Sequence, residues 1–320
     1  MKVFVTGGSG FVGGHVIESL AAEHEVVGMA RSERSAAVVA ERGGVAVHCS
    51  LDDVGPEHLE GVDVVVHAAA YVEEWGPYEA FHQANVVGTE RLLEAAQVAG
   101  VGRFVLISTN ATVHDGLGQR GVDESAPVPP HRRFPYGATK ALAERAVLAA
   151  NREGFTTLAL RPCFVWGPRD NSVLPALVRM VEEGNFLWLD GGRAKVSTTH
   201  IDNLVHAVRL GLAGGVGGRA YFVADDGDTT VRHFLEGLGA SAGLDLPGRS
   251  LPAAPVRWLA TGIEGVWRTF GLQTTPPITR MAVVLMSADM TVVSDRARAE
   301  LGWAPVIGFD QGMERLSASA

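Results

Sequence analysis

The chain has 320 residues, enough to bury a large core as one big unit or two closely packed ones. Its composition, 47% apolar and 20% charged, is that of a folded globular protein and excludes intrinsic disorder. A formal charge of −9, with no local cluster of Lys and Arg, leaves no electrostatic basis for binding nucleic acid. The two cysteines, Cys49 and Cys163, have neither disulfide-framework nor metal-ligand spacing, which is usual in a reducing compartment.

The N-terminus leads from Met1-Lys2 directly into the apolar run Val3-Phe4-Val5, so no secretory leader precedes the first expected strand. No uninterrupted apolar stretch reaches the roughly 18 residues that a membrane-spanning helix needs. We therefore expect a cytoplasmic protein without a stable membrane anchor.

Short apolar runs alternate with segments of helical period through the first half of the chain. Strands are expected near residues 2–6, 25–30, 45–49, 62–67, 103–108 and 156–161. Helices are expected near residues 11–23, 33–42, 78–99 and 135–151. The strand segments are rich in Val, Phe, Leu and Ile, which suits burial on both faces of a sheet. This alternation predicts an α/β fold of the Rossmann type, with a doubly wound parallel sheet.

The regular alternation ends after Arg161, where Pro-rich and Gly-rich connections separate shorter elements. This change predicts a smaller, discontinuous C-terminal substrate lobe. We expect a dinucleotide-binding domain over residues 1–165, which residues 196–228 rejoin, and a substrate-binding lobe over residues 166–195 and 229–320.

A glycine-rich loop, Thr6-Gly7-Gly8-Ser9-Gly10-Phe11-Val12-Gly13, joins the first expected strand to the first expected helix. Glycines permit a tight turn and a close approach of backbone to ligand. The helix N-terminus adds unpaired N–H groups and a partial positive charge. The loop therefore predicts a site for the pyrophosphate of a dinucleotide, held by Gly7, Gly10, Phe11, Val12 and Gly13.

The second expected strand ends in Arg31, where an NAD-preferring site would place a carboxylate for the ribose hydroxyls. A guanidinium pairs with a 2′-phosphate, which a carboxylate would repel. Arg31 therefore predicts that NADP(H) is the preferred cofactor, with NAD(H) as the alternative. The other interpretation of Arg31 is a solvated arginine at a helix entry, and the nearby Glu33 keeps it open.

Proton-transfer chemistry is indicated by Tyr136 and Lys140, which lie one helical turn apart on one face of the helix expected over 135–151. A free tyrosine has a pKa of ~10, so the charge of Lys140 is expected to favour its anion. The strand over 103–108 runs into Ser108-Thr109 at the carboxyl edge of the sheet, where a hydroxyl can hold a substrate oxygen.

Together these motifs resemble the extended short-chain dehydrogenase/reductase family, within the NAD-dependent epimerase/dehydratase superfamily, over nearly the whole chain. Four further segments are similar to family motifs: His67-Ala68-Ala69-Ala70, Asn85-Val86-Val87-Gly88-Thr89, Arg161-Pro162-Cys163-Phe164-Val165-Trp166-Gly167-Pro168 and Asp295-Arg296-Ala297-Arg298-Ala299-Glu300-Leu301-Gly302-Trp303. The branch that they resemble contains 3β-hydroxysteroid dehydrogenases, dihydroflavonol reductases and 2-alkyl-3-oxoalkanoate reductases.

The resemblance implies that Thr109, Tyr136 and Lys140 are catalytic, with Tyr136 as the acid/base, and that the protein is a homodimer without a metal. Because Asn110-Ala111 departs from the usual continuation, either Ser108 or Thr109 is the working hydroxyl. Ser50 stands where an aspartate often meets the adenine, so Asp52 is its expected substitute. The implied cofactor-binding residues are Gly7, Gly10, Phe11, Val12, Gly13, Arg31, Asp52, Ala68, Ala69, Asn85, Ser108, Tyr136, Lys140, Pro162, Phe164 and Val165.

The expected reaction interconverts a ketone and a secondary alcohol on a fairly apolar substrate of the hydroxysteroid, flavonoid or 3-oxoalkanoate type. Dehydration is disfavoured because Asn110-Ala111 lacks the acid pair of sugar dehydratases. One alternative is a nucleotide-sugar epimerase, with a diphosphate clamp built from arginines such as Arg193, Arg209 or Arg280. The other alternative is a non-catalytic module that senses NADP(H).

An apolar stripe at helical spacing runs through the late segment 256–270. A stripe of this kind is most often core, and here it would also suit the wall of an apolar substrate site. Contact with a membrane surface is the less favoured interpretation, because few cations accompany the stripe.

Overall fold

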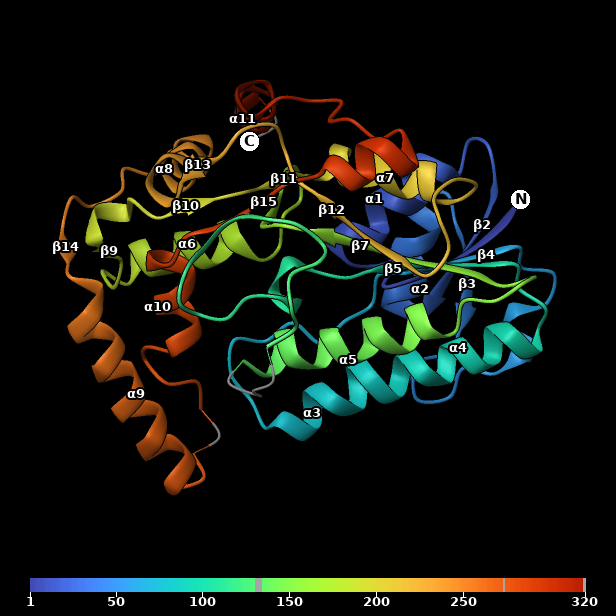
Figure 1. Cartoon of the computed structure of the whole chain (residues 1–320), viewed down its shortest axis with the longest axis horizontal. Coiled ribbons are helices and arrows are strands. Elements are labelled where there is room, and N and C mark those ends of the chain that lie inside the picture. The colour runs from blue at the N-terminus through green and yellow to red at the C-terminus, as the bar shows by residue number, and fades with distance from the viewer. Residues whose placement is uncertain (130–133, 273, 319–320) are drawn as a thin grey trace.

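A seven-stranded parallel sheet forms the centre of the computed structural model, which describes residues 1–129, 134–272 and 274–318 (Figure 1). The strands follow the order β12-β7-β5-β4-β1-β2-β3 across the sheet. Their bounds are β1 Lys2–Thr6, β2 Glu25–Ala30, β3 Val45–His48, β4 Val64–His67, β5 Arg103–Ile107, β7 Thr156–Pro162 and β12 Arg219–Val223. The predicted doubly wound parallel sheet is confirmed.

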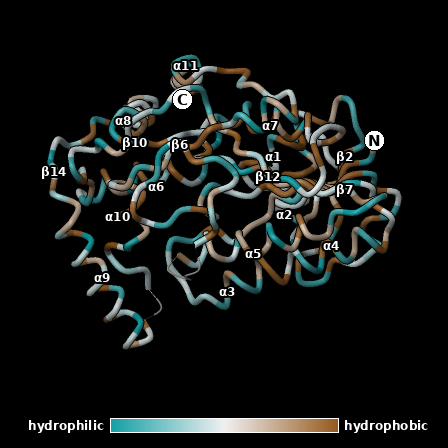
Figure 2. Tube along the Cα trace, viewed as in Figure 1, coloured by the Kyte–Doolittle hydropathy of each residue, from teal (hydrophilic) through white to brown (hydrophobic). Residues whose placement is uncertain are grey.

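Helices cover both faces of this sheet, because alternate side chains of its strands point to opposite sides. In β1, Val3 and Val5 join one apolar core and Phe4 joins the other. Figure 2 shows the apolar trace concentrated in these strands. The first core is covered by α1 (Phe11–Leu20) and α7 (Ile201–Gly211), and the second by α4 (Gly88–Val98) and α5 (Pro135–Ala149). The helix α2 (Glu33–Glu41) follows β2.

The helix predicted over 78–99 is divided into three parts. A π-helical turn, Gln83–Val87, separates α3 (Tyr78–His82) from α4. Within that turn the Asn85 side chain hydrogen-bonds to the backbone of Tyr71, and the backbone carbonyl oxygen of Asn85 accepts a hydrogen bond from the Thr89 hydroxyl. The π-helical turn therefore places Asn85 where its side chain holds the loop after β4 against the helices by hydrogen bonds.

The remaining elements build a second lobe beside the carboxyl edge of the sheet (Figure 1). Its largest sheet has the order β13-β10-β15-β6, and two short strand pairs, β11–β8 and β14–β9, flank it. The strand bounds are β6 Gln119–Val122, β8 Val165–Trp166, β9 Trp188–Leu189, β10 Lys195–Val196, β11 Thr199–His200, β13 Thr229–Thr230, β14 Ser250–Leu251 and β15 Met290–Val292. The helix bounds are α6 Val173–Glu182, α8 Val231–Ser241, α9 Ala253–Thr269, α10 Arg280–Ser287 and α11 Phe309–Ala318.

The apolar stripe predicted over 256–270 lies on α9, but most of it is neither core nor pocket wall. Val256 is buried, whereas Leu259, Val266 and Phe270 are 59%, 47% and 73% exposed. The prediction was wrong because α9 runs along the outer edge of the molecule and packs on the lobe by one side only (Figure 1). In the described part of the chain no helix is long and apolar enough to cross a membrane.

Candidate active site

The glycine loop has the geometry that a close-bound pyrophosphate requires. Gly7 has φ +69°, and a Cβ at this position would lie 2.9 Å from the backbone nitrogen of Ala69. A Cβ on Gly13 would lie 2.3 Å from the carbonyl oxygen of Gly7. The helix α1 begins after Gly10 with no side-chain cap and no acidic residue in its first turn. Its first N–H groups, on Phe11, Val12 and Gly13, are thus available to an anion, which fits a dinucleotide.

A buried chain of hydrogen bonds holds this loop against the end of β4. The Thr6 hydroxyl lies 2.7 Å from Nδ1 of His67 and accepts hydrogen bonds from the backbone N–H groups of Ala68 and Ala69. Nε2 of His67 lies 2.9 Å from the Thr89 hydroxyl. Burial lowers the pKa of His67 to about 3, so the ring is neutral and works as a spacer between two hydroxyls.

The residues predicted to meet the adenosine half follow β2 and β3. Arg31 comes directly after β2 and is exposed, and no ion pair joins it to a carboxylate within the described ranges. Glu33, which kept the other interpretation open, is 3.9 Å from His48 instead. Asp52 is exposed, and its backbone carbonyl accepts a hydrogen bond from Arg91.

Tyr136 and Thr109 meet where the start of α5 approaches the turn that follows β5. Gly137 permits this approach, because a Cβ there would lie 2.5 Å from the carbonyl oxygen of Ala111. Burial raises the pKa of Tyr136 to about 12, and a hydrogen bond with the Thr109 side chain opposes that shift. The Thr109 hydroxyl also accepts the N–H of Ala111 at 3.2 Å.

Lys140 lies one turn further along α5, and its ammonium donates a 2.8 Å hydrogen bond to the carbonyl oxygen of Ile107. Burial lowers the pKa of Lys140 to about 8, while the charge of Glu144 acts in the opposite direction. The expected lowering of the tyrosine pKa by Lys140 is therefore wrong for this structure. The Lys140 ammonium is held at the end of β5 by its hydrogen bond to Ile107, and burial has the largest effect on the pKa of the Tyr136 phenol.

Ser108, the other candidate hydroxyl, is engaged elsewhere. It donates a 2.6 Å hydrogen bond to Glu144, which also accepts a 2.9 Å hydrogen bond from Nε of Arg161. Of the two hydroxyls, Thr109 is the one whose side chain acts to lower the pKa of Tyr136. Sequence reasoning missed the Glu144–Arg161 pair, although Glu144 follows Lys140 by four residues and so shares its helix face.

The other predicted cofactor residues also gather at this edge of the sheet. Asn85 donates a 3.2 Å hydrogen bond to Thr139 on α5, in addition to its bonds with the backbone of Tyr71. Pro162 ends β7, while Phe164 and Val165 follow it and are partly buried. The structure thus brings the predicted catalytic residues and the segments of the predicted cofactor site to the carboxyl ends of β1, β2, β3, β4, β5 and β7.

A small pocket of about 20 Å³ lies beside Tyr136 between the two lobes. Its wall combines the start of α5, the loop after β4, and residues of α9 and α10: Glu73, Glu74, Trp75, Gly76, Phe134, Pro135, Tyr136, Glu264, Arg268 and Met281. Glu264 is buried and pairs with Arg280, 2.7 Å away, so its charge is compensated. At this volume the pocket has room for little more than one water molecule, and the phenol in its wall can exchange a proton with a group placed there.

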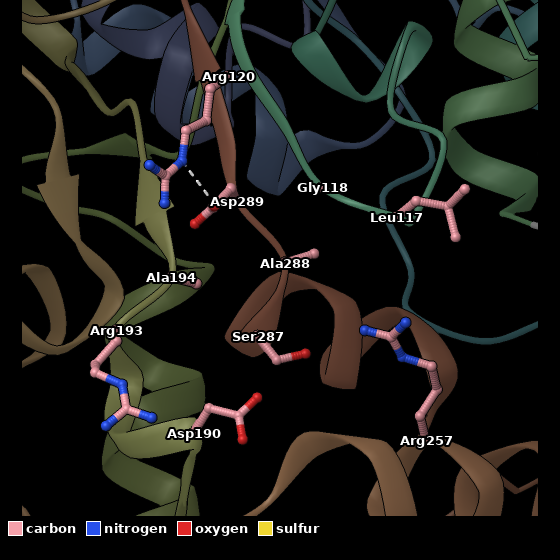
Figure 3. Close-up of a pocket in the computed structure, with 10 residues that line it drawn as sticks. All are labelled: Leu117, Gly118, Arg120, Asp190, Arg193, Ala194, Arg257, Ser287, Ala288 and Asp289. Atoms are coloured by element: carbon pink, nitrogen blue, oxygen red, sulfur yellow. Dashed lines mark hydrogen bonds and ion pairs between the residues drawn. The ribbon is translucent and has the colours of Figure 1, made fainter.

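A larger pocket of about 470 Å³ lies in the second lobe and does not include Tyr136 (Figure 3). Arg120, Arg193 and Arg257 line it together with Asp190 and Asp289, and Arg120 is paired with Asp289 at 2.8 Å.

The arginine clamp expected of a nucleotide-sugar epimerase is not assembled from the three predicted residues. Arg193 lines the larger pocket, but Arg209 pairs with Glu23 at 2.8 Å and Arg280 pairs with Glu264. Two of the three guanidinium groups are thus already neutralised by carboxylates.

Comparisons with known proteins agree with this geometry. Residues 3–224 match the model of the NAD dependent epimerase/dehydratase family. The chain is 38% identical over 319 residues to the 4-hydroxy-2-methyl-3-oxo-4-farnesyl-3,4-dihydroquinoline-1-oxide ketoreductase of Stigmatella aurantiaca, covering 99% of this chain and 96% of the relative. It is 32% identical over 332 residues to the 2-alkyl-3-oxoalkanoate reductase of Stenotrophomonas maltophilia, covering 100% and 99%.

A third curated relative, the 3 beta-hydroxysteroid dehydrogenase/Delta 5-->4-isomerase of Mycobacterium tuberculosis, is 31% identical, with 98% of this chain and 88% of the relative covered. Among solved structures, the dTDP-glucose 4,6-dehydratase of Streptomyces venezuelae with NAD bound gives a TM-score of 0.77 at 26% identity, covering 100% and 96%. The UDP-glucuronic acid 4-epimerase of Bacillus cereus with NAD gives 0.75 at 20% identity, covering 100% and 98%, and shows the fold alone.

Proposed function

Because the chain belongs to the NAD dependent epimerase/dehydratase family and is an oxidoreductase of it, we propose that it is an NADP(H)-dependent reductase of ketones on fairly apolar substrates. The observation that carries this proposal is the place of Tyr136 in the wall of the pocket between the lobes, at the start of the helix that also carries Lys140. We propose in addition that the protein acts in the cytoplasm as a homodimer, as its family resemblance implies.

When bound, the nicotinamide cofactor would supply the hydride, and the residues of this chain would position and protonate the carbonyl oxygen of the substrate. A carbonyl oxygen placed beside Tyr136 would accept the proton of the phenol, and with hydride added to the carbonyl carbon the products would be a secondary alcohol and a phenolate. Thr109 orients the phenol and the substrate oxygen, and Lys140 holds the end of β5 beside them through its hydrogen bond to the carbonyl oxygen of Ile107. Solvent then returns a proton to Tyr136, which completes the cycle.

The preference for NADP(H) rests on Arg31. Its guanidinium is exposed at the end of β2 and is free of an ion-pair partner among the described residues, so it can pair with a 2′-phosphate. Two of the similar solved structures, the dTDP-glucose 4,6-dehydratase and the UDP-glucuronic acid 4-epimerase, hold NAD, which keeps NAD(H) as the alternative cofactor.

The substrate class follows from the names of the relatives. One relative is named for a farnesyl-bearing dihydroquinoline oxide, one for an alkyl-oxoalkanoate and one for a hydroxysteroid, and each of these molecules combines a C–O function with a large apolar part. We propose the same class for this chain. The epimerase alternative is less well supported, since Arg209 and Arg280 are already ion-paired.

The test is Tyr136→Phe, which removes the phenol hydroxyl and keeps the ring. We expect a loss of at least 10³-fold in kcat on a panel of 3-oxoalkanoate and steroid ketones, within the range that positioned acids contribute. NADPH affinity should change little. Tyr78→Phe, which deletes a phenol hydroxyl on α3, is the matched control. Retained turnover in Tyr136→Phe would contradict the proposal, and so would turnover of a nucleotide sugar without net use of cofactor.

A further inference from the structure

The pocket beside Tyr136 is too small for the proposed substrate, whereas the pocket of the second lobe is not. At about 20 Å³ the first pocket holds little more than one water molecule. The second has a volume of about 470 Å³, which is within the roughly 300–1,000 Å³ of sites that enclose a small molecule. A ketone that reacts at Tyr136 therefore needs room elsewhere for most of its body, and the larger pocket has that room.

The same two helices line both pockets. On α9, Glu264 lines the small pocket and Arg257, seven positions earlier, lines the larger one. On α10, Met281 lines the small pocket and Ser287, six positions later, lines the larger one. At about 1.5 Å of rise per residue, these separations correspond to about 10 Å along each helix. The two pockets therefore lie at neighbouring positions along one pair of helices.

A thin apolar partition separates the pockets. Phe134 lines the small pocket two positions before Tyr136, and it packs in one buried cluster with Val284 and Ala288. Ala288 in turn lines the larger pocket. A Cβ on Gly116, which directly precedes two residues in the wall of the larger pocket, would lie 3.0 Å from the Phe134 ring. One layer of apolar side chains thus stands between the phenol and the larger pocket, so the part of a substrate that crosses it has to be apolar.

The wall of the larger pocket carries one positive charge in excess, because three arginines and two aspartates line it. Asp289 pairs with Arg120 at 2.8 Å and accepts the backbone N–H of Lys195 at 2.7 Å. Asp190 accepts the backbone N–H of Ala253, the first residue of α9, at 3.0 Å. Both carboxylates thus have work within the fold. The excess charge matches a ligand with a single negative charge, such as a carboxylate.

Arg193 and Arg257 are the arginines available to such a ligand, since neither is ion-paired within the part of the chain that the structure describes. Nε of Arg257 is buried and has no hydrogen-bond partner among the described residues. A buried N–H without an acceptor is costly, so a ligand that supplies one is favoured there. Figure 3 shows Arg193 and Arg257 on opposite sides of the pocket, with Ser287 between them. Guanidinium groups bind a carboxylate through charge-assisted hydrogen bonds.

We propose that the larger pocket binds the anionic end of the substrate, a carboxylate held by Arg257 and Arg193, while the ketone lies at Tyr136 about 10 Å away. The chain between the two groups lies against Phe134 and Val284, and these side chains move apart when the substrate binds. This inference rests on the proposed function and narrows its substrates to apolar ketones with a distant carboxylate. A nucleoside diphosphate matches the wall less well, because it brings more than one negative charge.

The test compares 10-oxoundecanoate with its methyl ester, which keeps the chain and the ketone but has no charge. With NADPH, the wild-type enzyme should have at least ten-fold higher kcat/KM for the acid, which is about 1.4 kcal/mol. Arg257→Met should remove this preference, and Arg193→Met should lower it. The matched control is Arg249→Met, which removes an exposed arginine outside both pockets and should keep the preference. The isomer 4-oxoundecanoate should lack it, because its carboxylate is too close to the ketone to span the pockets.

Equal reduction of acid and ester by the wild-type enzyme would overturn the proposal. So would an equal loss of both substrates in Arg257→Met and an unchanged preference in Arg193→Met, since the arginines would then only support the fold. Undecanoate, which has no ketone, should inhibit reduction of the acid competitively. Non-competitive inhibition would assign the pocket to a separate effector and refute the role in substrate binding.

Calorimetric titration with undecanoate separates the anion site from the proposed function. The wild-type protein should bind undecanoate, and Arg257→Met should bind it at least ten-fold more weakly. This result without turnover of any ketone would contradict the proposed function and leave the anion site supported. Equal binding by the two proteins, or none by the wild type, would refute the anion site whether or not ketones are reduced.

Discussion

The buried ion pair of Glu144 and Arg161 offers a sharp test of how the active site is supported. The two side chains are 4% and 6% exposed, and Glu144 also accepts the hydroxyl of Ser108. Glu144→Gln keeps the shape of the side chain but leaves the guanidinium of Arg161 buried without a counter-ion. Removal of one partner from a buried pair costs about 3–5 kcal/mol. We expect a fall of this size in the free energy of unfolding.

The same substitution also reports on Lys140. Burial lowers the pKa of Lys140 to about 8, and the charge of Glu144 keeps it from falling further. Without that charge the ammonium should lose its proton at lower pH. We therefore expect the alkaline limb of the pH profile of kcat/KM to move to lower pH in Glu144→Gln, together with the loss of stability.

Urea unfolding and pH-dependent ketone reduction measure the two effects. The control is Glu18→Gln, since Glu18 pairs with Arg169 at the surface, where the side chains are 38% and 46% exposed. A surface pair contributes about 0–1 kcal/mol, so this variant should stay close to the wild type in both assays. Equal destabilisation by the two substitutions, or an unmoved alkaline limb, would refute the role given to Glu144.

Three further predictions concern the cofactor loop and the end of β4. Gly13→Ala places a Cβ 2.3 Å from the carbonyl oxygen of Gly7, so NADPH titration should show at least ten-fold weaker binding. Arg31→Ala should lower kcat/KM with NADPH at least ten-fold and leave NADH unaffected; an unchanged ratio would count against the 2′-phosphate contact. His67 has a pKa of about 3, below its ordinary 6.5, so the unfolded chain takes up the proton first and stability is lost as pH falls from 6.5 towards 3. His67→Gln should reduce that acid dependence of Tm, and an equally steep dependence would contradict the reasoning.

The central sheet could be predicted because each of its strands has a recognisable local sequence pattern. Val64–His67 and Arg103–Ile107 are continuous apolar runs between helical segments, and burial on both faces demands that pattern. The residues of the candidate active site could be brought together for a similar reason. Tyr136 and Lys140 are four residues apart on one helix, and Ser108-Thr109 follows a strand, so short spacings place them at one edge of the sheet.

Features that depend on contacts between distant parts of the chain could not be predicted from the sequence pattern. The strand β6 pairs with β15 about 170 residues away, and each is four residues or fewer, too short for a periodic signal. Periodicity showed an apolar side of α9 but could not tell whether anything covers it. The choice between Ser108 and Thr109 depended on Glu144, whose partner Arg161 comes from a different element.

The protonation state of Tyr136 favours one direction of the proposed reaction. With a pKa of about 12 the phenol is protonated at neutral pH, which is the form that a ketone reductase needs before hydride transfer. Oxidation of an alcohol needs the phenolate instead, and burial opposes that form while the Lys140 ammonium bonds the carbonyl oxygen of Ile107. The rate of alcohol oxidation should therefore rise with pH more steeply than the rate of ketone reduction. Parallel pH profiles in the two directions would show that the charge of Lys140 reaches the phenol in the working enzyme and offsets its burial.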